Sequence, residues 1–168
     1  MVIPTQPLRE EHKELLPSIE LLQTIADSIG KSPIGSLRLG IDQAYEFLTH
    51  HLLPHALAEE QALYPVVGRL MGAPEATATM SRDHVEVGRL TEELGSLRSH
   101  LVSETISEDQ EKAMRRVLYG LYAVFKLHFA KEEEVYLPIL DARLTSEEAI
   151  RMFEAMEMAA KQAQGKPG

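Results

Sequence analysis

A histidine and a glutamate four positions apart occur twice in this sequence, as His55 with Glu59 and as His128 with Glu132. Residues four apart lie on one face of an α-helix, about 5–6 Å apart at Cβ, so both side chains can reach one metal ion or two adjacent ions. The chain has no cysteine, which excludes thiolate metal sites, iron–sulfur clusters and disulfides. Any metal must therefore bind to nitrogen and oxygen, and mixed imidazole and carboxylate ligands suit iron, manganese or zinc.

These two pairs belong to a duplicated unit. Residues 55–65, HALAEEQALYP, match residues 128–138, HFAKEEEVYLP, and each copy has a proline ten positions after its histidine. A lone histidine, His12 or His84, precedes each copy and itself follows an acidic residue. With two bridging carboxylates and two histidines per ion, each of two ions would have four protein ligands. An oxo or hydroxo bridge would be a fifth ligand and would leave an open position.

All six of these side chains interrupt apolar stripes that have helical periodicity. The periodicity places them in the interior, where an unpaired polar or charged group is costly. A single histidine on such a stripe is usually a hydrogen-bonded core residue, so a metal-free structural bundle is one alternative. Four histidines in duplicated register favour metal binding instead. The candidate metal ligands are His12, His55, Glu59, His84, His128 and Glu132.

Long amphipathic helices must position these side chains. Apolar residues recur at steps of three and four in five stretches, 8–29, 37–66, 80–101, 114–139 and 150–156. Ser107 with Gln110 and Thr145 with Glu148 fit capping boxes, and Ser32-Pro33 fits a further helix start. Because short connections make sequential helices antiparallel neighbours, the sequence predicts an all-α, up-down-up-down four-helix bundle with a short additional C-terminal helix.

Composition bounds the organisation and the partners. We expect one domain over residues 1–168, with the bundle at about 5–142, the extra helix at about 146–164 and a frayed tail at 164–168. The net charge of −9 repels nucleic acid and anionic lipid. No stretch approaches the roughly 20 apolar residues of a membrane span, and the first residues lack the features of a signal peptide. We therefore expect a cytoplasmic protein with no nucleic-acid or membrane partner.

The paired motifs resemble those of the hemerythrin-like, or HHE cation-binding, proteins over roughly residues 8–140. The resemblance implies a four-helix bundle with a non-heme di-iron centre, in which the six candidate residues are ligands and the two glutamates are bridges; zinc or manganese are the rival metals. The sequence departs from the oxygen-carrying members at two places. Met80 stands where those have an additional histidine, and the His-x-x-x-Glu of 128–132 replaces a His-x-x-x-x-Asp. Both departures argue against reversible oxygen carriage.

The functional expectation is binding or reduction of a small ligand, which is oxygen, hydrogen peroxide or nitric oxide. Whether this amounts to an enzymatic activity stays open. A regulatory module that senses iron or oxygen, and reports it through the C-terminal helix or an acidic surface, is the alternative from another class. No protein partner can be named from the sequence.

Several residues beside the motifs need their own interpretation. Glu60, Glu133 and Glu134 are expected to face solvent, as helical glutamates usually do. His51 stays open between an extra ligand and a hydrogen-bond donor behind the ligands, and Tyr64 between a packing residue and a group beside the metal. The internal prolines are expected to kink or end the helices next to the motifs, and they are Pro54, Pro65 and Pro138.

Overall fold

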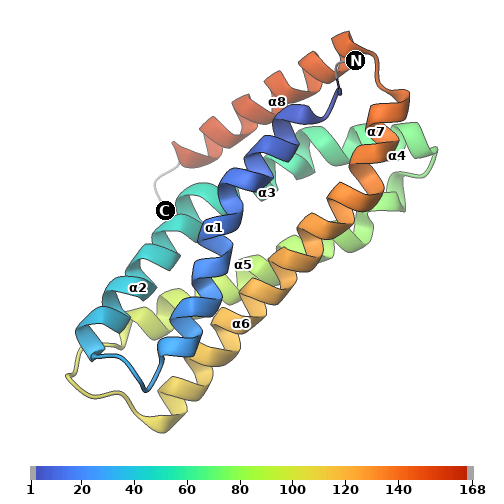
Figure 1. Ribbon diagram of the computed structural model, residues 1–168. Helices are drawn as coiled ribbons and strands as arrows, with labels where there is room; N and C mark the ends of the chain where they lie inside the picture. The colour runs from blue at the N-terminus through green and yellow to red at the C-terminus, as the bar shows by residue number, and fades with distance from the viewer. Residues whose placement is uncertain (1–2, 166–168) are drawn as a thin grey trace.

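The computed structural model describes residues 3–165, and these residues form five helical rods with no strand among them. The first rod is α1 (Gln6–Ser28), and the second consists of α2 (Ile34–Phe47), α3 (Leu53–Ala58) and α4 (Tyr64–Met71) (Figure 1). The third rod is α5 (Ala78–Ser99), and the fourth consists of α6 (Glu108–Lys131) and α7 (Leu137–Arg143). The fifth rod is α8 (Ser146–Gln164). The all-helical class is confirmed. Residues 166–168 of the tail that we expected to fray lie outside the described residues.

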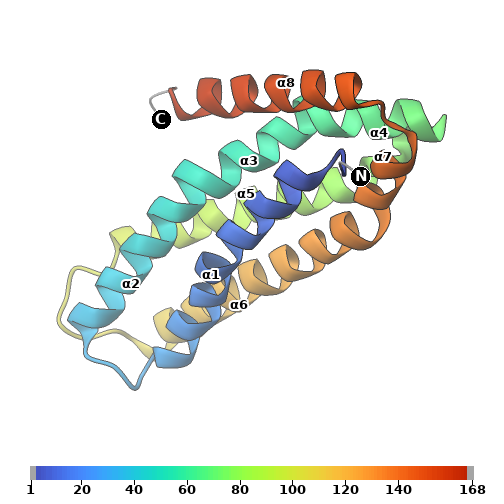
Figure 2. The same ribbon diagram turned by 45° about the horizontal axis from the view of Figure 1, so that its top comes forward.

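The long rods pack side by side along most of their length (Figure 1). α1 lies against α2 and α6, and α5 lies against α2 and α6. α8 lies across the end of the bundle that contains α3, and it packs on α3 and on the turn that follows α3 (Figure 2). No described helix is long and apolar enough to cross a membrane.

Local sequence signals set the starts of α6 and α8. Both predicted capping boxes are confirmed, since Ser107 and Thr145 accept from the backbone N–H three residues ahead while Gln110 and Glu148 bond back. The start of α2 differs from the expectation, because the N-cap is Pro33 and no side chain caps the helix.

Three turns of π-helix interrupt the rods, at Leu48–Leu52, Glu59–Leu63 and Glu132–Tyr136. Each begins six residues before a proline. In each, the residue directly before the proline donates its N–H to the carbonyl five residues back. Proline lacks an N–H and its ring would clash with the carbonyl four residues back in a regular helix. Each proline is therefore accommodated by one wider, π-helical turn and does not end the rod. Two of these π turns begin at the motif glutamates.

Each ligand-bearing rod has apolar residues on both sides of its candidate ligands. On one side lies a large apolar cluster, whose buried members include Ile19, Leu48, Leu52, Val87, Leu94, Leu118, Leu121 and Phe125. On the other side lies a small apolar cluster, whose buried members include Leu8, Leu63, Val67, Met80, Leu137, Leu140, Met152 and Met156. The six candidate ligands thus form a polar layer between two apolar clusters.

Candidate metal centre

Four rods contribute to the polar layer. One lone histidine comes from α1 and the other from α5, while α3 and α6 each contribute a histidine near their ends and the following π turns contribute the glutamates. Glu59 and Glu132 have no exposed surface at all, and the side chain of His84 is the most exposed of the six, at 10%. The structure brings together all six candidate metal ligands, which are His12, His55, Glu59, His84, His128 and Glu132.

The first half of the layer contains His12, His55 and one oxygen from each glutamate. His55 Nε2 lies 2.8 Å from Glu59 Oε1, and His12 Nε2 lies 3.2 Å from Glu132 Oε2. One ligand atom from each of these four residues lies within 4.8 Å of all the others. This spacing is compatible with a single ion bound by all four atoms.

The second half contains His84, His128 and the remaining carboxylate oxygens. His84 Nε2 lies 3.0 Å from Glu59 Oε2, and His128 Nε2 lies 3.4 Å from Glu132 Oε1. Each glutamate therefore turns one oxygen toward each histidine pair. This is the arrangement that a carboxylate bridge between two ions requires.

Polar atoms without partners test whether a metal fits. In the first half, four buried atoms have no hydrogen-bond partner, and they are His12 Nε2, His55 Nε2, Glu59 Oε1 and Glu132 Oε2. A buried polar atom without a partner costs about 1–3 kcal/mol, so four that converge on one point need an explanation. They are two nitrogens and two oxygens, which suits a divalent or trivalent transition metal.

Glu60 and Glu133 correct one of our expectations. Both were expected to face solvent, but Glu60 Oε1 lies 2.7 Å from His84 Nδ1 and Glu133 Oε1 lies 2.8 Å from His12 Nδ1. Glu60 also accepts from the hydroxyl of Ser81. The expectation failed because the partner histidines belong to other rods, and the position within one helix does not show which rod approaches.

Glu11 and Asp83 hold the other two histidines in the same way. Glu11 Oε1 lies 3.0 Å from His55 Nδ1, and Asp83 Oδ2 lies 2.9 Å from His128 Nδ1. A carboxylate only accepts, so each Nδ1 carries a proton and each Nε2 points inward, where a metal could take the place of its proton. We call these four acids, Glu11, Glu60, Asp83 and Glu133, the outer acids. Every one of them is the sequence neighbour of a candidate ligand.

Without a metal ion, protons on the histidines hold the layer together. Burial lowers the pKa of His12, but the nearby carboxylates of Glu132 and Glu59 outweigh burial and raise the pKa to about 9. Burial likewise opposes the charge of His128, whose pKa the same two carboxylates raise to about 10. Burial would raise the pKa of Glu59, yet the positive charge of His55 and the surrounding hydrogen bonds hold that pKa well below its usual range. Metal binding must therefore displace protons.

Tyr64 lies beside the second half of the layer. Its hydroxyl is 3.1 Å from Glu132 Oε1, 3.2 Å from His128 Nε2 and 3.3 Å from Glu59 Oε2, and its ring stacks on His84. Burial, together with the two carboxylates, raises the pKa of the phenol, so the hydroxyl stays protonated and donates. Of the two interpretations that we left open for Tyr64, the structure favours a group at the site.

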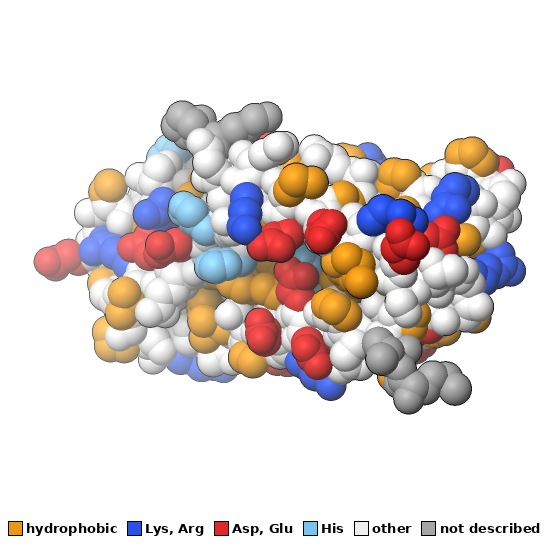
Figure 3. Space-filling view, turned by 90° about the horizontal axis from the view of Figure 1, so that it is seen from above, with side chains coloured by type: hydrophobic (Ala, Val, Ile, Leu, Met, Phe, Trp, Pro, Cys, Tyr) orange, Lys and Arg blue, Asp and Glu red, His pale blue; other side chains and the backbone are white. Residues whose placement is uncertain are grey.

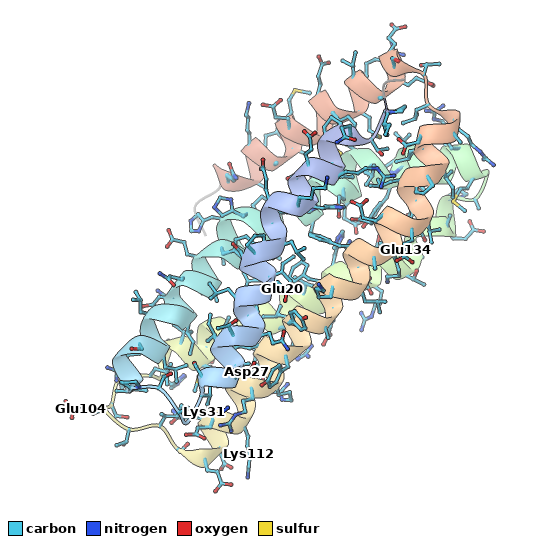
Figure 4. The ribbon with its side chains drawn as sticks, viewed as in Figure 1. Glu20, Asp27, Lys31, Glu104, Lys112 and Glu134 are labelled. Atoms are coloured by element: carbon cyan, nitrogen blue, oxygen red, sulfur yellow. The ribbon has the colours of Figure 1, made fainter. Side chains whose placement is uncertain are left out.

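Other residues lie away from the layer. His51 is exposed and stacks on Phe47, which argues against both roles considered for it. Met80 is fully buried in the small apolar cluster. Glu134 is exposed on the outer side of its rod, as expected (Figure 4).

Seen from above, the molecule carries acidic side chains around a hollow near the middle of the face that is in view (Figure 3).

The fold and the layer define an all-helical protein with a buried cluster of histidines and glutamates that is suited to a metal. The sequence model of the hemerythrin HHE cation-binding domain matches residues 4–140, and the chain therefore belongs to this family. No curated protein and no solved structure gives a significant match. α8 lies beyond the matched residues.

Proposed function

We propose that this protein is a non-heme di-iron protein that binds or reduces oxygen, hydrogen peroxide or nitric oxide. The observation that carries the proposal is the convergence of four unpartnered ligand atoms in one half of the layer, mirrored by a second histidine pair on the same two glutamates. In this proposal the four long rods form an up-down-up-down bundle in a cytoplasmic protein. Manganese or zinc is the less favoured metal.

The residues have separate roles in this proposal. His12 and His55 would hold one ion, His84 and His128 the other, and Glu59 with Glu132 would bridge them. A pair of iron ions bound there would supply one-electron redox chemistry. The outer acids accept the Nδ1 proton of each imidazole and so fix its orientation, with Nε2 aimed inward. This hydrogen bond also makes Nε2 a stronger electron-pair donor to a metal.

Met80 favours redox turnover over reversible carriage. A thioether in an apolar cluster stands where oxygen carriers of this family place an additional histidine, and exposed His51 does not replace it. The site then has more than one open position. A carrier needs a single position at which oxygen adds and leaves.

Oxygen exposure of protein loaded anaerobically with ferrous iron tests this proposal. We expect oxidation within the mixing experiment and no oxygen-dependent spectrum that reverses under vacuum. The ferric protein should consume hydrogen peroxide, and Met80→His should slow both reactions while iron content stays the same. A spectrum that forms and disappears reversibly in the unmodified protein would return the chain to the carrier class.

A sensor function is the second candidate, and one observation favours it. α8 packs on α3 and on the π turn Glu59–Leu63, which contain His55 and Glu59. The side chain of Gln164, at its end, also donates to the backbone carbonyl of His50. Hydrogen exchange of α8 with and without iron distinguishes the candidates, because a sensor requires a large change in α8.

A further inference from the structure

A second group of side chains lies behind the outer acids. Three of the four outer acids accept a further hydrogen bond from a side chain that stands three residues from the histidine that the acid holds. Residues three apart lie on one face of a helix, so the histidine and this further donor reach the acid from the same rod. The three donors are Arg9, Ser81 and Lys131.

Glu133 is held at both of its oxygens by α1. Its Oε1 lies 2.8 Å from His12 Nδ1, and its Oε2 lies 2.5 Å from Nη1 of Arg9. Arg9 Nη2 also lies 3.0 Å from Asp141 Oδ2, and Arg9 Nε donates to the hydroxyl of Thr5, which has no exposed surface. A guanidinium fixed by three partners leaves the Glu133 carboxylate little freedom to turn away from His12.

Asp83 is held at one oxygen by two groups of α6. Its Oδ2 accepts from His128 Nδ1, 2.9 Å away, and from the ammonium group of Lys131. The side chain of Asp83 is 23% exposed, so water competes for the carboxylate. The ammonium group holds the carboxylate in place against this competition.

The duplicated copies differ at the positions of these two cations. Position 81 matches position 9, and there Ser81 gives Glu60 a neutral hydroxyl. Position 58 matches position 131, and Ala58 has no side-chain donor. Glu11, which has no second side-chain donor within residues 3–165, is also the most exposed of the outer acids, at 48%. Each half of the layer therefore has one histidine whose acid is paired with a cation.

We infer that Arg9 and Lys131 are positioning residues of the centre, which act on His12 and His128 through the outer acids. Each cation keeps one carboxylate turned toward an imidazole Nδ1, and the carboxylate in turn keeps Nε2 of that imidazole aimed inward. The inference rests on the proposed function for its effect on the metal. The contacts that carry it need no metal.

Lys131→Met and Lys126→Met form a matched pair, because each removes a lysine of α6 that is paired with an acid. Lys126 is paired with Glu20, which is not an outer acid. Lys131→Met should weaken the binding of ferrous iron severalfold in competition with a chelator, and Lys126→Met should leave the affinity unchanged. Lys131→Arg should restore the affinity, because a guanidinium can donate to the same carboxylate.

A double-mutant cycle tests whether Lys131 acts through Asp83. In the Asp83→Asn protein, Lys131→Met should weaken iron binding no further, because the charged carboxylate is already absent. Additive losses would overturn the inference for Lys131, and so would equal losses in Lys131→Met and Lys126→Met.

Arg9 needs a different control, because it also connects α1 to α7 through Asp141. Asp141→Asn weakens that connection and leaves Glu133 unchanged. It should lower the melting temperature without speeding the exchange of the His12 Nδ1 proton with water, whereas Arg9→Met should do both. Equal exchange rates in the two variants would overturn the inference for Arg9.

A measurement on the metal-free protein separates failure of this inference from failure of the proposed function. Asp83 accepts the Nδ1 proton of His128, and NMR of protein with isotope-labelled histidine follows the exchange of this proton with water. Exchange should be severalfold faster in Lys131→Met and unchanged in Lys126→Met. Unchanged exchange in Lys131→Met would overturn the inference even if iron binds. Faster exchange in a protein that binds no iron would keep Lys131 as the residue that positions His128 and would remove the proposed function.

Discussion

The large apolar cluster and the polar layer lie next to each other along the same rods, yet they are built in opposite ways. The large cluster contains only apolar side chains, and most of it lies on regular α-helix. The layer buries five ionisable groups and most of a sixth, His84, and its two glutamates begin π turns. Burial of ionisable groups opposes folding unless each finds a partner. The large cluster therefore holds the rods together, whereas the unpartnered atoms of the layer are suited to a metal.

The π turns also distinguish the polar layer from the large cluster. The residue that opens each motif π turn is the glutamate itself, and the proline follows six positions later. Wide helical turns of this kind occur often at functional sites. The prolines thus shape the layer, whereas the large cluster has no such turn except Leu48–Leu52 at its border.

Metal removal should produce the largest difference between the two regions. Because the proposed site exists only in the folded state, free iron at about 1,000 times Kd should add about 4 kcal/mol to the free energy of unfolding. Differential scanning calorimetry of iron-loaded and metal-free protein measures this as a higher melting temperature with iron. Identical melting temperatures would mean that the layer does not bind the metal.

Substitutions in the large cluster and in the layer should give the next largest difference, because one should change stability and the other iron content. Leu118→Ala, in the large cluster, should cost about 2–5 kcal/mol of stability and leave iron content unchanged. Glu59→Gln should lose iron from both halves, because Glu59 turns one oxygen toward each histidine pair. Iron analysis of both variants checks this. Loss of only half of the iron in Glu59→Gln would show that the glutamate is not shared.

The outer acids should have an intermediate effect. Asp83→Asn and Glu133→Gln weaken the hold on one imidazole each, and loss of such a partner typically costs 10–100-fold in metal affinity. Glu134→Gln, at an exposed position beside Glu133, is the matched control and should change nothing. Competition with a chelator measures the affinities. Equal affinity in all three variants would mean that Asp83 and Glu133 do not support metal binding.

The pH dependence of the metal-free protein should show the smallest effect. The folded pKa values of His12 and His128, about 9 and about 10, exceed the ordinary value of 6.5. Their stabilising contribution is therefore complete below pH 6.5 and is lost as the pH rises through 9 and 10. Thermal melts of metal-free protein between pH 6 and pH 10 should show a falling melting temperature. A melting temperature that rises over this range would contradict the proton-held layer.

Much of the layer could be predicted from the sequence, because the duplication puts the candidate residues in register. Periodicity placed His12 and His84 in the interior, and the four-residue spacing placed Glu59 beside His55, which are properties of single helices. Their assignment as metal ligands stays a prediction.

The remaining features depend on contacts between rods. Glu60 directly follows Glu59 on the π turn and points to another side of it, and only the approach of α5 brings it to His84. Tyr64 reaches His128 on a different rod, and Phe129 reaches His12 on another. The duplication did contain a signal for the outer acids, since an acidic residue precedes each lone histidine and follows each motif glutamate in both copies. It contained none for Tyr64 or Phe129, whose matching positions hold other residues.

The most direct test of the central claim is the iron content per chain of protein reconstituted with ferrous iron, measured with its absorption spectrum after oxidation. We expect two iron ions per chain, with charge-transfer absorption that Glu59→Gln abolishes. One ion per chain, or none, in iron-replete protein would contradict a shared pair of glutamates between two histidine pairs.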